Sequence, residues 1–442
     1  MKKDINVDVH HLTRVEGHGN IVVNIKSGNI EKCEWQVPEA PRFFEAMVRD
    51  RHYSEVQRIT SRICGICSIG HTLVAVKAVE DALGIQVSPQ TDKLRRIIKH
   101  AENFDSHVLH LGVLVAPDLL GAPSVFPLVE THGEVVKLVL RLKRLGHEWG
   151  SLLAGRTTHP TTIVPGGFSK LPTRDELIDL KEKILENADG INALVETVLS
   201  LSGKIPDFQR PTEYMAVSND QEYGMYLGST VQTIMPDGTK QMYDVQDYRS
   251  ITNEYVDPRS TAKYCKNKLD SYAAGALSRF NNNYDQLYPQ AKKISEDLGM
   301  RPVVGNPFLN SAAQLVECAH SVYETLDLLE ELIADGIKDE KPVPPAQSSQ
   351  FGQGVAAVEV PRGILFQEYA FDSEGFCTMA NCIIPTGQNH ANIQKDFEAF
   401  VPLLLEQDKS EEEMEFDLSM LVRAYDPCIS CSTHYLDVKF VK

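Results

Sequence analysis

The sequence lacks a long hydrophobic run. Its most apolar stretch, residues 108–129, is interrupted by Asp118 and by prolines. It therefore falls short of the roughly 20 apolar residues that a membrane-spanning helix needs. No apolar signal segment follows Met1 to Asp4 either. We expect a chain without a membrane span that resides in the cytoplasm.

Positive charge is scarce. The chain has 44 Lys and Arg against 61 Asp and Glu, which gives a formal net charge of -17. An acidic surface repels the phosphate backbone of nucleic acids, and no cluster of basic residues offsets that repulsion here. We therefore expect no nucleic-acid partner.

Disulfides are not expected, because nine cysteines without a secretory segment are typical of a reducing compartment. The sequence also has no cysteine set for an iron-sulfur cluster of its own. Several cysteines have no motif partner, and we interpret them as buried structural thiols. They are Cys33, Cys265, Cys318 and Cys377.

Hydrophobic periodicity predicts a mainly helical α+β protein, with a core of long helices and small antiparallel sheets. Alternation over residues 19–37 predicts strands of an N-terminal sheet at about 5–38, and tyrosine-rich alternation predicts a hairpin-rich insertion at about 212–256. We expect residues 1–442 to form a single domain. Helical periodicity covers 40–50, 72–83, a stretch from 91, 173–201, 308–337 and 389–405, and short strands fall between 356 and 384.

Two Cys-x-x-Cys pairs lie at opposite ends of the chain, Cys64 with Cys67 and Cys428 with Cys431. Four converging thiolates favour a soft metal. A structural zinc site is one interpretation and a redox disulfide within each pair is another. Zinc ribbons, however, place their pairs roughly 15 to 20 residues apart, whereas these pairs bracket almost the whole chain.

The residues around both pairs resemble the two signature motifs of the large subunit of nickel-iron hydrogenases. The matching blocks run from Arg62 to His71 and from Asp426 to His434. Three further segments match in the same order, namely Leu12 to Gly19, Val360 to Gly363 and Ile384 to Asn389.

This resemblance implies a catalytic subunit that cleaves dihydrogen reversibly into protons and electrons. It is greatest to the cytosolic multi-subunit branch, group 3. An alternative is a non-catalytic scaffold related to the quinone-module subunit of respiratory complex I. That sister family lacks the four cysteines, so their presence favours the hydrogenase.

The resemblance also implies a binuclear centre with carbon monoxide and two cyanides on its iron. Nickel would be held by all four cysteines, with Cys64 and Cys428 terminal, while Cys67 and Cys431 would bridge to the iron. The thiolate of Cys428 would accept the proton from dihydrogen, and Glu16 would be the next group on the proton path.

Further residues match positions around that centre. Arg362 would overhang the two metals, and Pro361 and Thr386 would surround the cyanides. Asp118 would brace the guanidinium of Arg362. His71 would donate a hydrogen bond to a bridging sulfur.

A buried magnesium site is also implied, with Glu45, the backbone carbonyl of Cys382, His434 and waters as oxygen and nitrogen ligands. Gln367 stands where the family pattern leads us to expect a histidine. Many members of the family are cut just after the residue that matches His434, which leaves residues 435–442 as a tail that is either retained or removed.

Electrons must leave through another chain, because this one has no cluster cysteines. The resemblance implies an iron-sulfur small subunit that docks near Cys64, His159 and Gly166-Gly167. Further electron-transfer subunits of the flavin, nicotinamide, ferredoxin or heterodisulfide type would complete the complex.

Overall fold

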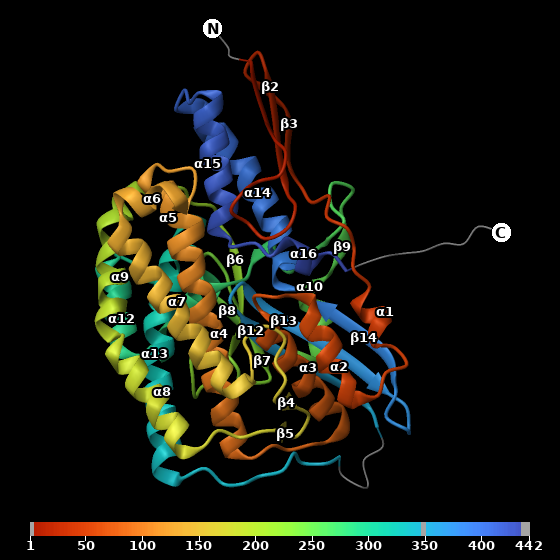
Figure 1. Cartoon of the computed structure of the whole chain (residues 1–442). Coiled ribbons are helices and arrows are strands. Elements are labelled where there is room, and N and C mark those ends of the chain that lie inside the picture. The colour runs from red at the N-terminus through yellow and green to blue at the C-terminus, as the bar shows by residue number, and fades with distance from the viewer. Residues whose placement is uncertain (1–3, 346–350, 435–442) are drawn as a thin grey trace, which may run out of the picture.

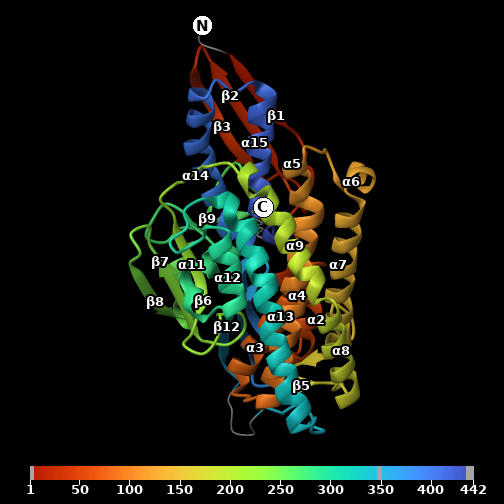
Figure 2. The ribbon, with the colours of Figure 1, turned by 90° about the vertical axis from the view of Figure 1, so that its left-hand side faces the viewer.

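Long helices gather on one side of the molecule, at the left in Figure 1, in a computed structural model that describes residues 4–345 and 351–434. Helices α4 (Pro89–Leu109) and α7 (Gly133–Ala154) pack together, and α13 (Asn310–Asp335) packs on α4. In Figure 2, which is turned by 90° from Figure 1, α12 (Pro289–Asp297) lies beside α13. The predicted long-helix core is confirmed.

The start of α4 follows from its sequence. The Ser88 hydroxyl accepts the Thr91 amide at 3.1 Å, and Pro89 takes the first helical position, where its missing N–H costs nothing. Leu94 and Ile98, one helical turn apart, are fully buried.

One predicted helix is in fact two. Residues 173–201 form α8 (Arg174–Glu186) and α9 (Ala188–Leu201), with Asn187 between them. Thr173 and Glu176 form a capping box at the start of α8. The backbone of Asn187 leaves the helical region, and its amide bonds to Ile184 to end the helix.

The N-terminal sheet is confirmed as an antiparallel meander of β1 (Ile5–Val9), β2 (Asn20–Lys26) and β3 (Asn29–Gln36). Alternate residues of β2 are buried, as a sheet with one covered face requires. Helix α14 (Pro385–Glu406) contacts β3, and α15 (Glu411–Ala424) contacts β1.

The hairpin-rich insertion forms β6 (Glu213–Ser218), β7 (Thr230–Ile234) and β8 (Lys240–Asp244). Its sheet gains a fourth strand, β11 (Tyr272–Ala273), which pairs with β6 in parallel. The expectation of purely antiparallel sheets is therefore wrong at this one pairing.

A buried sheet carries the Pro-Arg-Gly motif. It consists of β12 (Gln353–Val360), β13 (Gly363–Phe371) and β14 (Cys377–Ile383). The turn between β12 and β13 needs glycine, because Gly363 has φ +133° and an added Cβ would meet the Ala274 side chain at 2.7 Å.

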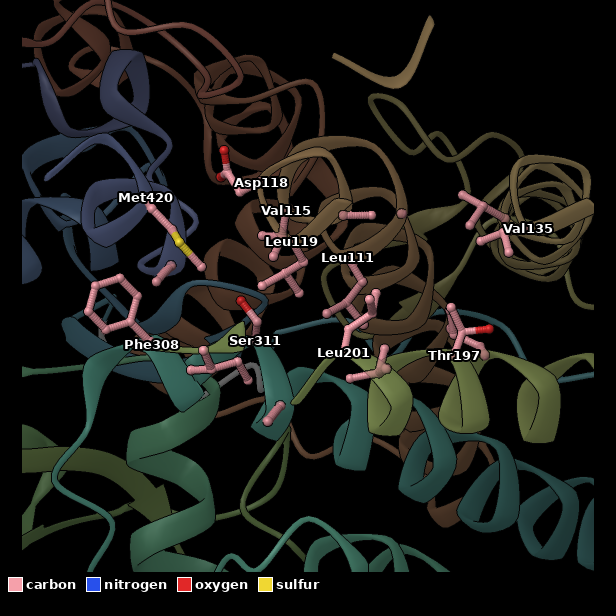
Figure 3. A pocket seen from close by; sticks show the side chains of 18 residues that line it. Leu111, Val115, Asp118, Leu119, Val135, Thr197, Leu201, Phe308, Ser311 and Met420 are labelled. Carbon is pink, nitrogen blue, oxygen red and sulfur yellow. The ribbon is translucent and has the colours of Figure 1, made fainter. Parts of the chain in front are cut away.

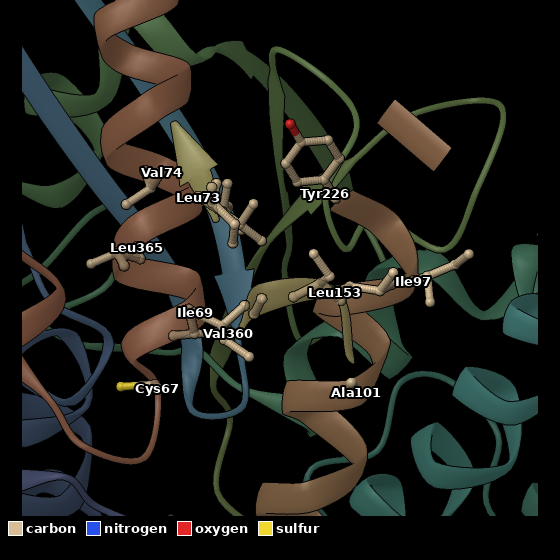
Figure 4. Packing of buried hydrophobic residues seen from close by; sticks show 14 of the residues in the cluster. Cys67, Ile69, Leu73, Val74, Ile97, Ala101, Leu153, Tyr226, Val360 and Leu365 are labelled. Atoms are coloured by element: carbon tan, nitrogen blue, oxygen red, sulfur yellow. The ribbon is translucent and has the colours of Figure 1, made fainter. Parts of the chain in front are cut away.

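Helix α3 (Ser68–Leu83) lies across β12 and β13, and Cys67 sits at its N-terminal end (Figure 4). The chain thus brings Cys67 and the Pro-Arg-Gly turn together. The shorter helices are α1 (Phe44–Val48), α2 (Val56–Thr60), α5 (Ala116–Leu120), α6 (Val125–Thr131), α10 (Tyr248–Thr252), α11 (Ala276–Asn283) and α16 (Ile429–Ser432), with a π-helix at His110–Val115. The remaining strands are β4 (Ile163–Val164), β5 (Gly167–Phe168), β9 (Tyr255–Val256) and β10 (Lys263–Tyr264).

Among residues 4–345 and 351–434, no single helix is long and apolar enough to cross a membrane. The helical stretches 89–120 and 125–131 reach the required length and hydropathy only as a bent pair. The tail 435–442 lies outside the described residues. That the chain forms one domain stays a prediction.

Candidate metal centre

The four motif cysteines converge on one point. Cys67 directly precedes α3 and Cys428 directly precedes α16, so residues from the two ends of the chain meet. All four cysteines are buried, and their sulfurs lie within 4.8 Å of one another. The Cys64 and Cys428 sulfurs are 3.5 Å apart. Four soft donors at this spacing suit a thiophilic metal ion.

Cys428 and Cys431 are joined as a disulfide, which the sequence analysis considered only as an alternative interpretation of each pair. The contact follows from the convergence of the four sulfurs. Cys33 is half-buried and so departs from its interpretation as a buried thiol, whereas Cys265, Cys318 and Cys377 are buried as expected.

The local field favours a thiolate at Cys64. A hydrogen bond from Cys67 lowers the pKa of the Cys64 thiol, and the nearby guanidinium of Arg362 lowers it further, against the opposing effect of burial. The Cys67 backbone amide also donates to the Cys64 sulfur at 3.2 Å. Metal binding requires a deprotonated sulfur, so these contacts prepare the site.

Arg42 ties the two cysteine loops together. Its Nη2 donates to the carbonyl of Ile63 at 2.8 Å and to that of Ser430 at 2.5 Å. These residues directly precede Cys64 and Cys431. Sequence reasoning missed Arg42, although this residue lies within the predicted helix 40–50, three residues before Glu45.

Arg362 lies at the turn beside this sulfur cluster and is buried. Its Nη2 donates to Asp426 at 2.8 Å, and its Nη1 contacts the Ser106 hydroxyl at 3.4 Å. The carboxylate that braces Arg362 is therefore Asp426, and the assignment of that role to Asp118 is wrong.

Asp118 binds two other arginines. Arg423 Nη1 donates to both carboxylate oxygens, at 2.8 and 3.0 Å, and Arg14 Nη2 donates to Oδ1. The π-helix that precedes α5 changes the helical register between Ser106 and Asp118. The number of residues between them therefore does not predict the direction of the Asp118 side chain.

Thr386 and Pro361 both lie where the cysteine loop meets the core. The Thr386 hydroxyl accepts the backbone amide of Cys428 at 3.0 Å, which leaves its own proton free to donate. The carbonyl of Pro361 accepts from Arg279 at 3.1 Å. Thr386 thus holds the backbone of Cys428, and Arg279 holds the backbone of Pro361.

Glu16 runs alongside Cys428. The two residues form a parallel β-bridge, in which the Glu16 amide donates to Pro427 and the Glu16 carbonyl accepts from Ile429 at 2.9 Å. The Glu16 carboxylate accepts from the amide of Ser430 at 3.1 Å and contacts its hydroxyl. Ser430 was missed, although it lies inside the second cysteine motif.

His71 is completely buried on α3. Neither ring nitrogen has a hydrogen-bond partner among the described residues. Burial lowers the pKa of His71 to about 3, and His434 and Arg42 contribute in the same direction. The ring is therefore neutral, with one N–H available to donate.

Glu45, Cys382 and His434 meet at the edge of the sheet. The Cys382 amide donates to Glu45 Oε1 at 2.8 Å, and Nδ1 of His434 lies 3.5 Å from the same oxygen. In an antiparallel strand the N–H and C=O of one residue face the same side, and β14 is an edge strand, so the Cys382 carbonyl faces Glu45 too. The three predicted ligands are brought together.

Unsatisfied donors surround the sulfur cluster. Besides His71, the Nε of buried Arg362 has no hydrogen-bond partner in the described chain. Buried polar groups are normally satisfied, so donors left open next to four thiols fit a bound group that carries acceptors. Gln367 is buried, and Tyr369 donates to its side-chain oxygen at 2.6 Å.

A second cluster of possible ligands, His100, His320 and Glu324, was not predicted. Arg96 already donates to Glu324 at 2.5 Å, and the backbone amide of Tyr288 faces Nδ1 of His320 at 3.4 Å. These donors tie the cluster into a buried network, in which Nε2 of His320 lies 2.9 Å from Glu324.

Comparison with known proteins defines the class. The family model for nickel-dependent hydrogenase matches residues 42–127 and 209–434, and a model described as HoxL-like matches residues 6–40. The chain belongs to the nickel-dependent hydrogenase family.

The relatives are hydrogenase subunits. Sulfhydrogenase 1 subunit alpha of Pyrococcus furiosus is 33% identical over 437 residues, which cover 97% of each chain. Sulfhydrogenase 2 subunit alpha of the same organism is 31% identical over 436 residues, covering 97% of this chain and 99% of that one. A solved NAD+-reducing [NiFe]-hydrogenase has a TM-score of 0.86 at 27% identity, covering 97% of this chain and 99% of its own.

This chain is accordingly the catalytic large subunit of a hydrogenase, an oxidoreductase that acts on dihydrogen at a nickel-iron centre. The zinc and scaffold alternatives are not favoured. The predicted α+β fold is confirmed as well.

Proposed function

We propose that Cys64, Cys67, Cys428 and Cys431 hold the nickel, and that Cys67 and Cys431 also hold an iron with one carbon monoxide and two cyanides. When bound, the centre supplies the Lewis acidity and the redox change that heterolytic cleavage of dihydrogen requires. The observation that carries this proposal is the convergence of four buried sulfurs from both ends of the chain.

Arg362 and Thr386 would serve the diatomic ligands. Cyanide nitrogen accepts hydrogen bonds, and both residues have donors that the described structure leaves unused. His71 would donate its single N–H to a bridging sulfur. The buried, rigid surroundings would keep these donors in fixed directions.

Protons would leave through Cys428 and Glu16. The Cys428 sulfur takes one proton of dihydrogen as a base and passes it to the Glu16 carboxylate, and the backbone bridge between the two residues keeps them adjacent. Ser430 holds that carboxylate on the cysteine loop through its amide and hydroxyl.

Magnesium is the proposed occupant of the Glu45, Cys382 and His434 site. A carboxylate and a backbone carbonyl are ligands that suit a hard cation, and waters would complete its shell. Burial raises the pKa of Glu45, but contacts with His434 and the Cys382 amide outweigh it and keep that pKa below its ordinary value. An ionised Glu45 is the form that binds a cation.

Electrons would pass to an iron-sulfur small subunit, and from it to further subunits with flavin, nicotinamide, ferredoxin or heterodisulfide chemistry, in the cytoplasm. The proposed docking surface lies around His159, whose ring contacts the Ser61 carbonyl at 2.9 Å and whose amide donates to Ser68 at 2.9 Å. These contacts place His159 beside the loop that carries Cys64.

The Glu16→Gln variant tests the proton route. Glutamine keeps the size and most hydrogen bonds of Glu16 but cannot cycle a proton, so turnover should fall at least about a hundredfold. Nickel and iron content and the infrared bands should stay as in the wild type.

Glu213→Gln is the matched control. Glu213 is a buried carboxylate that also accepts a backbone amide, from Lys268 at 3.0 Å, but it lies in the β6 strand away from the cysteine motifs. Its turnover per bound nickel should stay close to that of the wild type, because its carboxylate contacts Asn267, Lys268 and Leu269 and no residue of the cysteine motifs. Near-normal turnover of a fully loaded Glu16→Gln enzyme would contradict the proton route.

A further inference from the structure

Asp118 is a buried carboxylate that holds two arginines from distant parts of the chain. Arg423 near the end of α15 donates to both of its oxygens, and Arg14 from the N-terminal segment donates to one. The carboxyl group is fully shielded from solvent, and the side chains of Arg14 and Arg423 are 12% and 7% exposed. These three residues form what we call the arginine clasp.

The arginine clasp fixes the backbone that leads to Glu16. Arg423 Nε donates to the Thr13 carbonyl at 3.1 Å, and Arg14 Nη1 donates to the Leu114 carbonyl at 2.7 Å. The carbonyl of Arg423 accepts the amide of Asp426 at 2.8 Å. The same clasp therefore reaches both the Glu16 segment and the loop of Cys428.

The Glu16 segment has little regular structure to hold it in place. Arg14 has φ +61° and Gly17 has φ +85°, so the backbone on both sides of Glu16 is left-handed. A non-glycine residue in this region is disfavoured and persists only where its surroundings impose it. The Arg14 side chain is held by the Leu114 carbonyl and by Asp118, and these contacts favour that backbone conformation.

The negative charge of Asp118 is needed for the clasp. Burial and the neighbouring Arg14 both lower the pKa of Arg423, and Asp118 opposes them. Asp118 also lies on the wall of an apolar cavity lined mainly by residues such as Leu111, Val115 and Leu119 (Figure 3). Such a lining offers the two guanidinium groups no second carboxylate.

We propose that Asp118 is a positioning residue for proton transfer, which holds the Glu16 carboxylate next to Cys428 through Arg14 and Arg423. This rests on the proposed function of Glu16 as the acceptor of the Cys428 proton. Asp118 itself touches neither residue and takes no part in the transfer.

The test is the Asp118→Asn variant in the complete complex. We expect turnover to fall about tenfold or more, because small misplacements of a transferring group are costly. The KM for dihydrogen and the nickel and iron content should not change. Hydrogen-deuterium exchange should be faster at the amides of Glu16 and Ile429, which close the bridge to the Cys428 loop.

Asp396→Asn is the matched control. Asp396 is equally buried, but its carboxylate accepts from Arg210 at 2.6 Å and from the Tyr425 hydroxyl rather than from residues 13–16. It should leave exchange at Glu16 and the turnover as they are in the wild type. Arg14→Lys is a second probe. Lysine keeps the positive charge but cannot bind the Leu114 carbonyl and Asp118 with two separate nitrogens, so this variant should show the same faster exchange at the Glu16 and Ile429 amides.

The double variant Glu16→Gln with Asp118→Asn separates the two proposals. If Asp118 acts through Glu16, the double variant should be no slower than Glu16→Gln alone. Multiplied losses, unchanged exchange in both Asp118→Asn and Arg14→Lys, or loss of nickel in Asp118→Asn would overturn the positioning role. Near-normal turnover of Glu16→Gln would instead overturn the proton route on which it rests.

Discussion

Arg362 donates to Asp426 at 2.8 Å, and this pair joins the turn between β12 and β13 to the loop of Cys428. Both side chains are almost completely buried. A buried ion pair costs desolvation and is strongly destabilising to break, so its value lies in the geometry that it imposes. Here it fixes a guanidinium beside the four cysteine sulfurs.

Replacement of Asp426 by Asn should therefore impair the centre. The variant leaves Arg362 buried without its charge partner, and such losses typically cost about 3 to 5 kcal/mol. We expect a lower apparent melting temperature and turnover reduced at least about tenfold, measured on enzyme with a known nickel content.

Ser106→Ala serves as the comparison, because the Ser106 hydroxyl contacts the same guanidinium at a longer 3.4 Å. Loss of one long hydrogen bond, while the guanidinium keeps its carboxylate partner, costs roughly 1 kcal/mol, so turnover should change only about fivefold or less. Equal effects of the two variants would show that Asp426 has no special part in holding Arg362.

Each of Cys64, Cys67, Cys428 and Cys431 changed to Ser should abolish nickel retention. A hydroxyl is a harder and far less acidic donor than a thiol, so it binds nickel poorly in a thiolate site. Elemental analysis of the purified complex measures the outcome. Cys318→Ser is the control, since Cys318 is buried in α13 outside the cluster, and it should keep its nickel.

The pH dependence of stability should report on a buried carboxylate, Glu359. Burial raises the pKa of Glu359 from its ordinary value of 4.5 to about 7, although Arg279 donates to it at 2.8 Å. Between these two pH values the folded state binds more protons than the unfolded state, so the free energy of unfolding falls as pH rises.

Glu359→Gln removes that titration. The apparent melting temperature of the wild type should decline between about pH 5 and pH 7 more steeply than that of the variant, by the linkage between protonation and folding. Thermal denaturation of both proteins across this range measures the slopes. Parallel curves would show that Glu359 does not take up a proton on folding.

The convergence of the motif residues could be predicted because their spacing in the sequence is local. A Cys-x-x-Cys pair places two sulfurs together whatever the rest of the chain does, and the second motif already contained Asp426 and Ser430. Glu45, Cys382 and His434 are also brought together at the edge of the sheet, and their role as magnesium ligands stays a prediction.

Asp118 shows where such reasoning ends. Its partner could not be deduced from sequence, because the π-helix at His110–Val115 changes the direction in which α5 presents it. The ends of helices are also hard to predict from sequence. The hydrophobic periodicity of residues 173–201 continues across Asn187, although one helix ends there and another begins. Arg42 was missed because its contacts link residues 21 and 388 positions away.

The most direct test is the infrared spectrum of the purified complex. Metal-bound carbon monoxide and cyanide absorb where protein does not, so an iron held by Cys67 and Cys431 should give one carbon monoxide band and two cyanide bands. These bands should vanish in the Cys67→Ser variant. A complex with stoichiometric zinc, no nickel and no such bands would contradict the account.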